Sequence, residues 1–348
     1  MQRRVLPLSL ACLLGCALMP TCAADASGKQ QDNVIFDAYT PLASSEVLLQ
    51  RLVTPLNARR LLQQAKTTRT SIREQPIDLT QERFALYVPA QAPPSGYALL
   101  VFVPPWNDAK VPPSWIPALE HLGVILVTPA NAGNDANVLD RRVPLALLAA
   151  ANVMSRYRID PRRVYVGGFS GGSRVALRLA LGYPDLFHGA LLDAGSDVVG
   201  EQVPLPSREQ LEQFQTSTRI VYLTGERDAA RLDADRQSRQ SLKTWCVTDV
   251  DVRTMPWSAH ELADGSAFER ALASLDHHKA PDPATLASCR ARIVAELDAQ
   301  LDDADALLAH GDRERARRRL EQIDAHLGGL AAPRSVELMQ RLDATAPK

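Results

Sequence analysis

A serine between glycines is the first feature of this chain that could do chemistry. Residues 168–172 read Gly-Phe-Ser-Gly-Gly, which matches the pattern G-x-S-x-G. The apolar residues 164–166 before the pattern read as a strand, and residues 173–181 after it read as a helix. In this context the pattern predicts a tight, strained turn that exposes the serine hydroxyl above a sheet. We therefore predict that Ser170 is a nucleophile, and set aside a glycine-rich turn with an incidental serine.

An acid and a base would have to follow later strands to reach this serine. Two further predicted strands are followed by Asp228 and by His260, respectively. A histidine there can take the proton of the serine hydroxyl, and a carboxylate can hold the imidazole in the required tautomer. Asp193, after the preceding predicted strand, is the competing acid, and Asp228 could instead be a solvated loop carboxylate. We predict the triad Ser170, Asp228 and His260.

The region around the serine resembles a known family. Residues 156–186, RYRIDPRRVYVGGFSGGSRVALRLALGYPDL, resemble the nucleophile region of polyhydroxybutyrate depolymerase-like and feruloyl esterase-like α/β-hydrolases. The Gly-x-x-Asp of residues 225–228 matches the place of the acid in that family. The resemblance covers roughly residues 78–278. It implies a serine hydrolase acting on an ester, in the chain order serine, acid, histidine, with no metal and no organic cofactor.

One loop departs from the family pattern. The attacked carbonyl develops an oxyanion that needs hydrogen-bond donors, and the Gly171 N–H at the start of a helix is one predicted donor. The family usually has His-Gly or similar after residues 98–103, but this chain has Pro-Pro-Trp-Asn, and proline has no N–H. The second donor must then be Trp106, Asn107 or a group elsewhere, and we assign it to the Trp106 N–H. The Trp106 side chain either walls the acyl pocket or packs in the core.

The elements that would position these residues alternate between strand and helix. Over residues 76–278, strand-like runs such as 98–103 are apolar throughout, which is typical of strands buried on both faces. This alternation predicts an α/β class protein with a mainly parallel sheet covered by helices, the α/β-hydrolase fold. Residues 25–75 form an N-terminal, partly helical segment. Residues 284–348 predict a C-terminal α-helical hairpin, whose apolar stripes would dock on the hydrolase domain or on a protein partner.

The first 24 residues read as a signal peptide. Arg3 and Arg4 precede an uncharged, mostly apolar run over residues 5–19, and small residues end at Ala24. The run is shorter than the ~20 residues that span a bilayer. We therefore expect an exported protein, periplasmic or secreted, and no membrane span in the mature chain. An uncleaved anchor and a lipoprotein modified at Cys16 are the weaker alternatives.

Only Cys246 and Cys289 remain once this leader is removed. Two cysteines in an exported protein predict one disulfide bond, and the alternative is two separate buried thiols. The bond would clamp the hairpin to the core beside the loop that bears His260. The chain has no Cys-x-x-Cys pair and no His/Cys cluster, so we expect no zinc site.

Composition narrows the function classes. Hydrophobic residues make up 46% and charged residues 23%, which excludes a wholly disordered chain, and a net charge of −1 gives no basic surface for nucleic acid. Two classes remain open. One is an exported serine esterase acting on a small-molecule or polymeric ester, with peptidase and acyltransferase variants that use the same triad. The other is a catalytically weak or inactive binding protein on the same fold.

Overall fold

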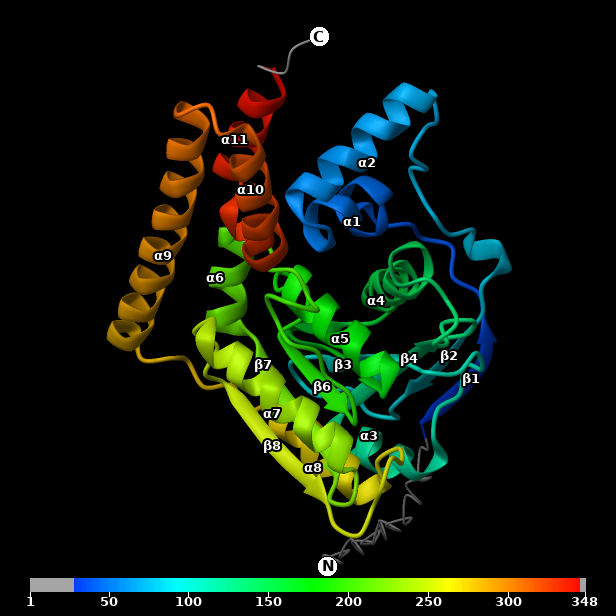
Figure 1. The fold of residues 1–348 in the computed structure, drawn as a ribbon. Helices are drawn as coiled ribbons and strands as arrows, with labels where there is room; N and C mark the ends of the chain where they lie inside the picture. Colours follow the sequence, from blue (N-terminus) through cyan, green and yellow to red (C-terminus); the bar gives the residue numbers. More distant parts are fainter. Residues whose placement is uncertain (1–27, 345–348) are drawn as a thin grey trace, which may run out of the picture.

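A twisted eight-stranded sheet forms the centre of the molecule (Figure 1). The structure is a computed structural model and describes residues 28–344. The strand order is β1-β2-β4-β3-β5-β6-β7-β8; β2 pairs antiparallel with β1 and β4, and all other pairs are parallel. This order is that of the α/β-hydrolase fold and confirms the predicted fold class. The strands are β1 (Lys29–Val34), β2 (Phe84–Val88), β3 (Tyr97–Val103), β4 (Val124–Pro129), β5 (Ile159–Phe169), β6 (Gly189–Asp193), β7 (Arg219–Gly225) and β8 (Val250–Met255).

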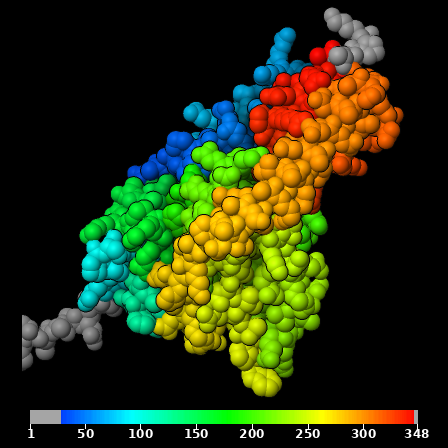
Figure 2. All heavy atoms as spheres, turned by 90° about the vertical axis from the view of Figure 1, so that its left-hand side faces the viewer, coloured from blue at the N-terminus to red at the C-terminus, as the bar shows by residue number. Residues whose placement is uncertain are grey.

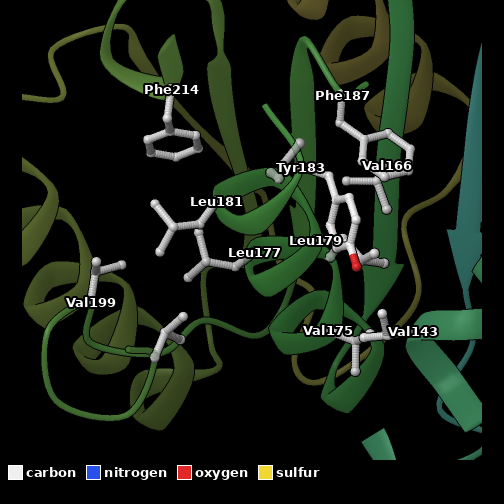
Figure 3. Close-up of a cluster of buried hydrophobic side chains, with 14 of the residues drawn as sticks. Val143, Val166, Val175, Leu177, Leu179, Leu181, Tyr183, Phe187, Val199 and Phe214 are labelled. Carbon is white, nitrogen blue, oxygen red and sulfur yellow. The ribbon is translucent and has the colours of Figure 1, made fainter. Parts of the chain in front are cut away.

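Helices bury both faces of the sheet. Successive β3 side chains alternate between two apolar clusters: Leu99, Val101 and Val103 belong to one, and Leu100 and Phe102 to the other. The first cluster lies under α4, α5, α6 and α7, and Figure 3 shows its α5 side chains packed together. The second lies under α3 and α8. These helices are α3 (Ile116–Leu122), α4 (Val143–Arg156), α5 (Gly171–Gly182), α6 (Arg208–Ser217), α7 (Ala229–Thr244) and α8 (Gly265–Leu275).

The N-terminal segment contains a strand as well as helices. Lys29–Val34 pairs antiparallel with β2 and forms an edge of the sheet. After it, α1 (Ser45–Leu52) and α2 (Pro55–Thr68) add Leu48 and Leu56 to the first apolar cluster. The helical stretch is broken before Pro55, which is the first residue of α2, a position where its missing N–H leaves no hydrogen bond unmade.

Up to residue 344, the C-terminal part has three α-helices, so the predicted two-helix hairpin is incomplete. The C-terminal helical unit consists of α9 (Pro283–Ala309), α10 (Arg313–Leu327) and α11 (Arg334–Ala344). Leu338 and Leu342 of α11 are buried against the apolar stripes of α9 and α10, which two helices alone would leave exposed. This unit also packs against α2. In Figure 2 its orange and red helices form one end of the molecule, beside the blue N-terminal helices.

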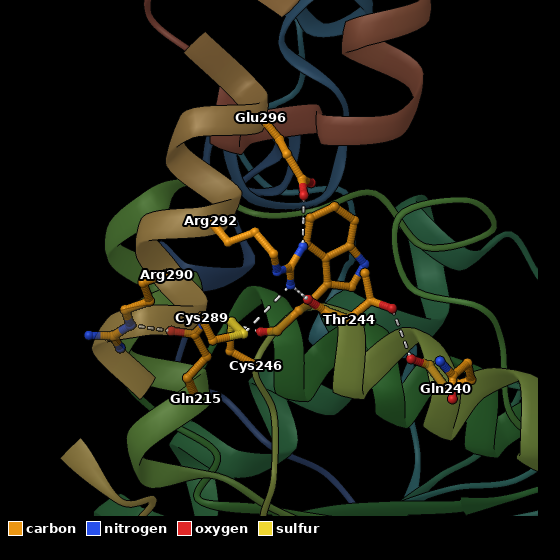
Figure 4. The surroundings of a disulfide bond; sticks show 9 residues. Gln215, Gln240, Thr244, Cys246, Cys289, Arg290, Arg292 and Glu296 are labelled. Carbon is orange, nitrogen blue, oxygen red and sulfur yellow. Dashed lines mark hydrogen bonds and ion pairs between the residues drawn. A yellow bond between two sulfur atoms is a disulfide. The ribbon is translucent and has the colours of Figure 1, made fainter. Parts of the chain in front are cut away.

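A disulfide bond between Cys246 and Cys289 fastens α9 to the core (Figure 4). Next to it, Arg292 donates to the Thr244 carbonyl oxygen at 3.0 Å, and Arg290 donates to Gln215 Oε1 at 2.6 Å. The pairing is as predicted, but the expected place beside the histidine loop is wrong. Cys246 precedes β8 whereas His260 follows it, so the bond and the histidine lie at opposite ends of that strand.

Within residues 28–344 no helix is both long and apolar enough to cross a bilayer. The predicted signal peptide, residues 1–24, lies outside the described residues.

Candidate active site

The turn from β5 to α5 holds Ser170 in a strained conformation. Its φ of 55° and ψ of −116° lie outside the regions that side chains other than glycine favour. A Cβ at Gly172 would lie 1.9 Å from the Val103 carbonyl oxygen, and one at Gly168 would lie 2.3 Å from the Gly172 carbonyl carbon. Glycine is therefore required at both positions, because neither has room for a side chain. The turn matches the geometry that the sequence pattern predicts.

The structure brings Ser170, His260 and Asp228 into one hydrogen-bonded chain. His260 Nε2 lies 2.9 Å from Ser170 Oγ, and His260 Nδ1 lies 2.6 Å from Asp228 Oδ2. Since the carboxylate can only accept, Nδ1 carries the proton and Nε2 accepts from the serine hydroxyl. The Asp228 side chain is 10% exposed and the His260 side chain 40% exposed. A substrate can thus reach the histidine while the acid is shielded.

Backbone contacts fix the loops that carry the acid and the histidine. The acid loop (residues 226–228) donates through Glu226 N–H to the Met255 carbonyl oxygen at 3.0 Å and through Arg227 N–H to that of Ser258 at 2.9 Å. Asp228 Oδ1 accepts from the Arg231 N–H at 3.3 Å and so caps α7. One carboxylate oxygen is therefore bonded to the imidazole and the other to the start of a helix, which fixes the direction of the carboxylate.

Asp193, the competing acid, makes no hydrogen bond to His260 in the described part of the chain. It lies at the end of β6 and is 1% exposed. Its Oδ2 accepts from the Ala263 N–H at 3.0 Å, and its Oδ1 has no partner. Burial raises the pKa of the Asp193 carboxyl well above its usual value. Its carbonyl oxygen accepts from the Ser170 N–H at 2.7 Å, so Asp193 supports the serine turn.

Aromatic rings line the site next to the histidine. The Phe169 ring lies 5.1 Å from the His260 ring and 6.2 Å from the Trp106 ring, centroid to centroid. Trp106 is half-buried, so its ring is neither free in solvent nor a central core residue. Trp257, three residues before the histidine, is 80% exposed. Apolar parts of a substrate would meet these rings.

A further neighbour of the serine turn is the amide segment (residues 131–135), which follows β4. The Asn134 side chain lies against Gly171: a Cβ there would be 2.1 Å from Asn134 Oδ1. No motif marks this segment in the sequence, because its asparagine and glycine content is typical of any loop.

Among residues 28–344, no three His, Cys, Asp or Glu side chains lie together in a way that could hold a metal ion.

No protein-family profile and no curated protein matches the chain. Among solved structures it is similar to a ferulic acid esterase, with 14% identity and a TM-score of 0.42 over 55% of this chain and 88% of that one. An esterase from Thermogutta terrifontis has 16% identity and a TM-score of 0.42, over 58% and 88%. An S-formylglutathione hydrolase from Staphylococcus aureus has 10% identity and a TM-score of 0.44, over 56% and 92%. At these values the assignment of the α/β-hydrolase fold rests on the strand order and on the turn at Ser170.

Proposed function

We propose that this protein is an exported serine hydrolase that cleaves carboxylic esters. The observation that carries the proposal is the hydrogen-bonded chain from Ser170 Oγ through His260 to Asp228, at 2.9 Å and 2.6 Å. These are the distances at which a base can take the serine proton and a carboxylate can stabilise the resulting imidazolium. The strained turn at Ser170 supports the same role, because strain of this kind gathers at functional sites.

The proposed reaction has two halves. Ser170 Oγ attacks the ester carbonyl while His260 Nε2 takes its proton, and the imidazolium then gives that proton to the leaving alcohol. Water attacks the acyl-enzyme in the same way and regenerates the serine. The Gly171 and Trp106 N–H groups would stabilise the oxyanion in both halves. His260 moves every proton in this route, which calls for no metal and no cofactor.

The substrate class follows from the open, aromatic-lined site. The exposed side of His260 and the rings of Phe169 and Trp106 suit an ester with an apolar acyl or alcohol group, either a small molecule or the end of a polymer. Peptidase and acyltransferase activities would use the same triad and are variants of the proposal. Export rests on the leader at residues 1–24, and a single disulfide suits an oxidising compartment.

The second candidate is a binding protein on a hydrolase fold. It is favoured by the prolines at positions 104 and 105, which remove two N–H groups from the loop beside the serine. The C-terminal helical unit would then be a surface for a protein partner.

A fluorophosphonate probe separates the two candidates. We expect the wild type to be labelled at Ser170 and to hydrolyse members of a panel of p-nitrophenyl and feruloyl esters. Ser170→Ala should be unlabelled and inactive with an unchanged circular dichroism spectrum, whereas the matched control Ser258→Ala should behave as the wild type. A folded wild type that is neither labelled nor active would support the binding protein.

A further inference from the structure

The loop after β3 offers few backbone donors for the oxyanion of the proposed reaction. Pro104 and Pro105 have no N–H, so the Gly171 N–H has no partner donor at the start of that loop. We propose that the side-chain amide of Asn134 is a catalytic hydrogen-bond donor that stabilises the oxyanion together with the Gly171 and Trp106 N–H groups. This inference rests on the proposed function and names a further catalytic residue for it.

The first support is position. Gly171 is the first residue of α5, where free N–H groups and the helix dipole favour a negative charge. The space that a side chain at Gly171 would occupy is filled by the Asn134 amide, whose Oδ1 and Nδ2 lie 2.1 Å and 3.2 Å from the ideal Cβ position. Which of these two atoms faces the glycine is set by hydrogen bonding, and an oxyanion at Gly171 selects the NH₂ group.

The second support is the rigidity of the backbone around Asn134. Its own N–H donates to the Pro105 carbonyl oxygen at 3.0 Å, and the Gly133 N–H donates to Asn107 Oδ1 at 3.0 Å. The amide segment is thus fastened to the loop that begins with the two prolines. A donor held in place before the reaction does not have to be reoriented during it, which is the property that makes such groups effective.

A buried arginine also joins the amide segment to the loop after β3. Arg142 is 4% exposed and donates to the Ala132 carbonyl oxygen at 2.8 Å and to that of Pro104 at 3.0 Å. Desolvation lowers the pKa of Arg142 to about 10, so its guanidinium stays charged at neutral pH. The cation thereby fixes the distance between the amide segment and the loop after β3.

The third support is that the Asn134 amide is available. Asn134 is exposed, and its side chain makes no hydrogen bond to any residue between 28 and 344. The Asn134 N–H is engaged while the side-chain amide is not, so the NH₂ group is free for a ligand. Glycine at position 171 is what leaves room for it.

The test compares Asn134→Ala and Asn134→Asp with the wild type. Loss of one oxyanion donor should lower kcat about 10²–10³-fold with little change in KM. The affinity for a trifluoromethyl ketone, whose adduct with Ser170 carries the oxyanion, should fall in parallel with kcat. The melting temperature should stay unchanged. Lys110→Ala, an exposed change in the loop after β3, is the matched control and should have wild-type kinetics.

A double-mutant cycle adds a readout that a purely structural role would not give. Gly171→Ala introduces a Cβ that collides with the Asn134 amide, so it should lower kcat in the wild type. In the Asn134→Ala background the space is vacant, and Gly171→Ala should cost little more. Additive losses in the cycle would contradict the contact on which the proposal depends.

Other outcomes overturn the proposal directly. If Asn134→Ala keeps kcat within about threefold of the wild type, the Trp106 N–H suffices and Asn134 is not a donor. If KM rises while kcat stays, Asn134 contacts only the bound substrate. If the wild type itself neither reacts with a fluorophosphonate nor cleaves esters, the proposed function has failed, and the role of Asn134 fails with it.

Discussion

Burial separates the two acids that compete for the histidine. Asp193 ends β6 and Asp228 follows β7, and because these parallel strands are neighbours, both acids lie at the carboxyl end of the sheet. The difference arises in the loops. The acid loop is paired with the backbone around Ser258 and directs Asp228 at His260, while Asp193 points under Ala263 into the protein. The residue types were predictable, but the hydrogen bonds between loops were not.

Exchange of each acid for its amide tests this difference. We expect Asp228→Asn to lower kcat by about 10⁴, because the amide favours the wrong imidazole tautomer. Asp193→Asn should keep kcat close to that of the wild type, since the Asp193 carboxyl does not contact the imidazole. The measurement is steady-state kinetics on a p-nitrophenyl ester, with circular dichroism as the folding control. The reverse pattern would make Asp193 the acid.

The buried Asp193 carboxyl should also make stability depend on pH. Burial raises its pKa in the folded protein, so between the usual value of 3.8 and the raised value only the folded state holds the proton. The contribution of Asp193 to the free energy of unfolding therefore falls as pH rises through that interval. Asp193→Asn should be more stable than the wild type at about pH 8, and this gain should shrink towards about pH 4. Urea unfolding of both proteins across that range is the measurement; a gain independent of pH would contradict it.

At the scale of elements, the local sequence pattern predicts the buried strands, because these are apolar. It does not predict the elements that form only through contacts with other parts of the chain. The runs in β3 and β4 are apolar throughout, and both strands are buried as expected. The sequence of β1, Lys-Gln-Gln-Asp-Asn-Val, has no apolar alternation, and it is a strand because it pairs with β2 at the edge of the sheet. In the same way α11 depends on the surface left by α9 and α10, which no local pattern describes.

One such long-range contact begins a helix. Thr54 precedes α2 but makes no capping hydrogen bond with its side chain. Instead the Leu56 N–H donates at 3.0 Å to Oδ1 of Asp324 in α10. Asp324 is 4% exposed. The C-terminal helical unit thus supplies the cap of an N-terminal helix more than 250 residues away in the chain.

Removal of this cap should destabilise the protein. We expect Asp324→Ala to lower the free energy of unfolding by about 1–2 kcal/mol, because it removes the acceptor and leaves a buried helix N–H without a partner. Asp324→Asn keeps an acceptor and should cost less. Asp303→Ala, which removes an exposed ion pair with Arg319, is the control and should change stability by about 0.5 kcal/mol or less. If Asp324→Ala and Asp303→Ala lower the free energy of unfolding equally, the cap at Asp324 does not stabilise the protein more than an exposed ion pair does.

At the scale of the whole molecule, β8 separates the disulfide bond from the loop that carries His260. The disulfide joins α9 to Cys246, which precedes the first residue of β8, and the histidine loop follows the last residue of β8. Six residues of strand span about 20 Å. The disulfide therefore holds α9 at the end of β8 that lies away from the histidine loop, and the C-terminal helical unit also contacts α2, α6 and the end of α7. We infer that the unit stabilises the fold and leaves the serine site open.

The disulfide allows stability and catalysis to be separated in one experiment. The Cys246–Cys289 bond closes a loop of 43 residues, for which the chain-entropy model gives about 4 kcal/mol of stabilisation. Reduction of the wild type, or the double change Cys246→Ser and Cys289→Ser, should therefore lower the melting temperature. Ester hydrolysis well below that temperature should be unchanged, because the bond and His260 lie at opposite ends of β8. A non-reducing peptide map, thermal melts and kinetics of the oxidised and reduced protein are the measurements. Two free thiols in the natively exported protein would contradict the clamp, whereas a folded, reduced protein without activity would place the C-terminal helical unit in the active site.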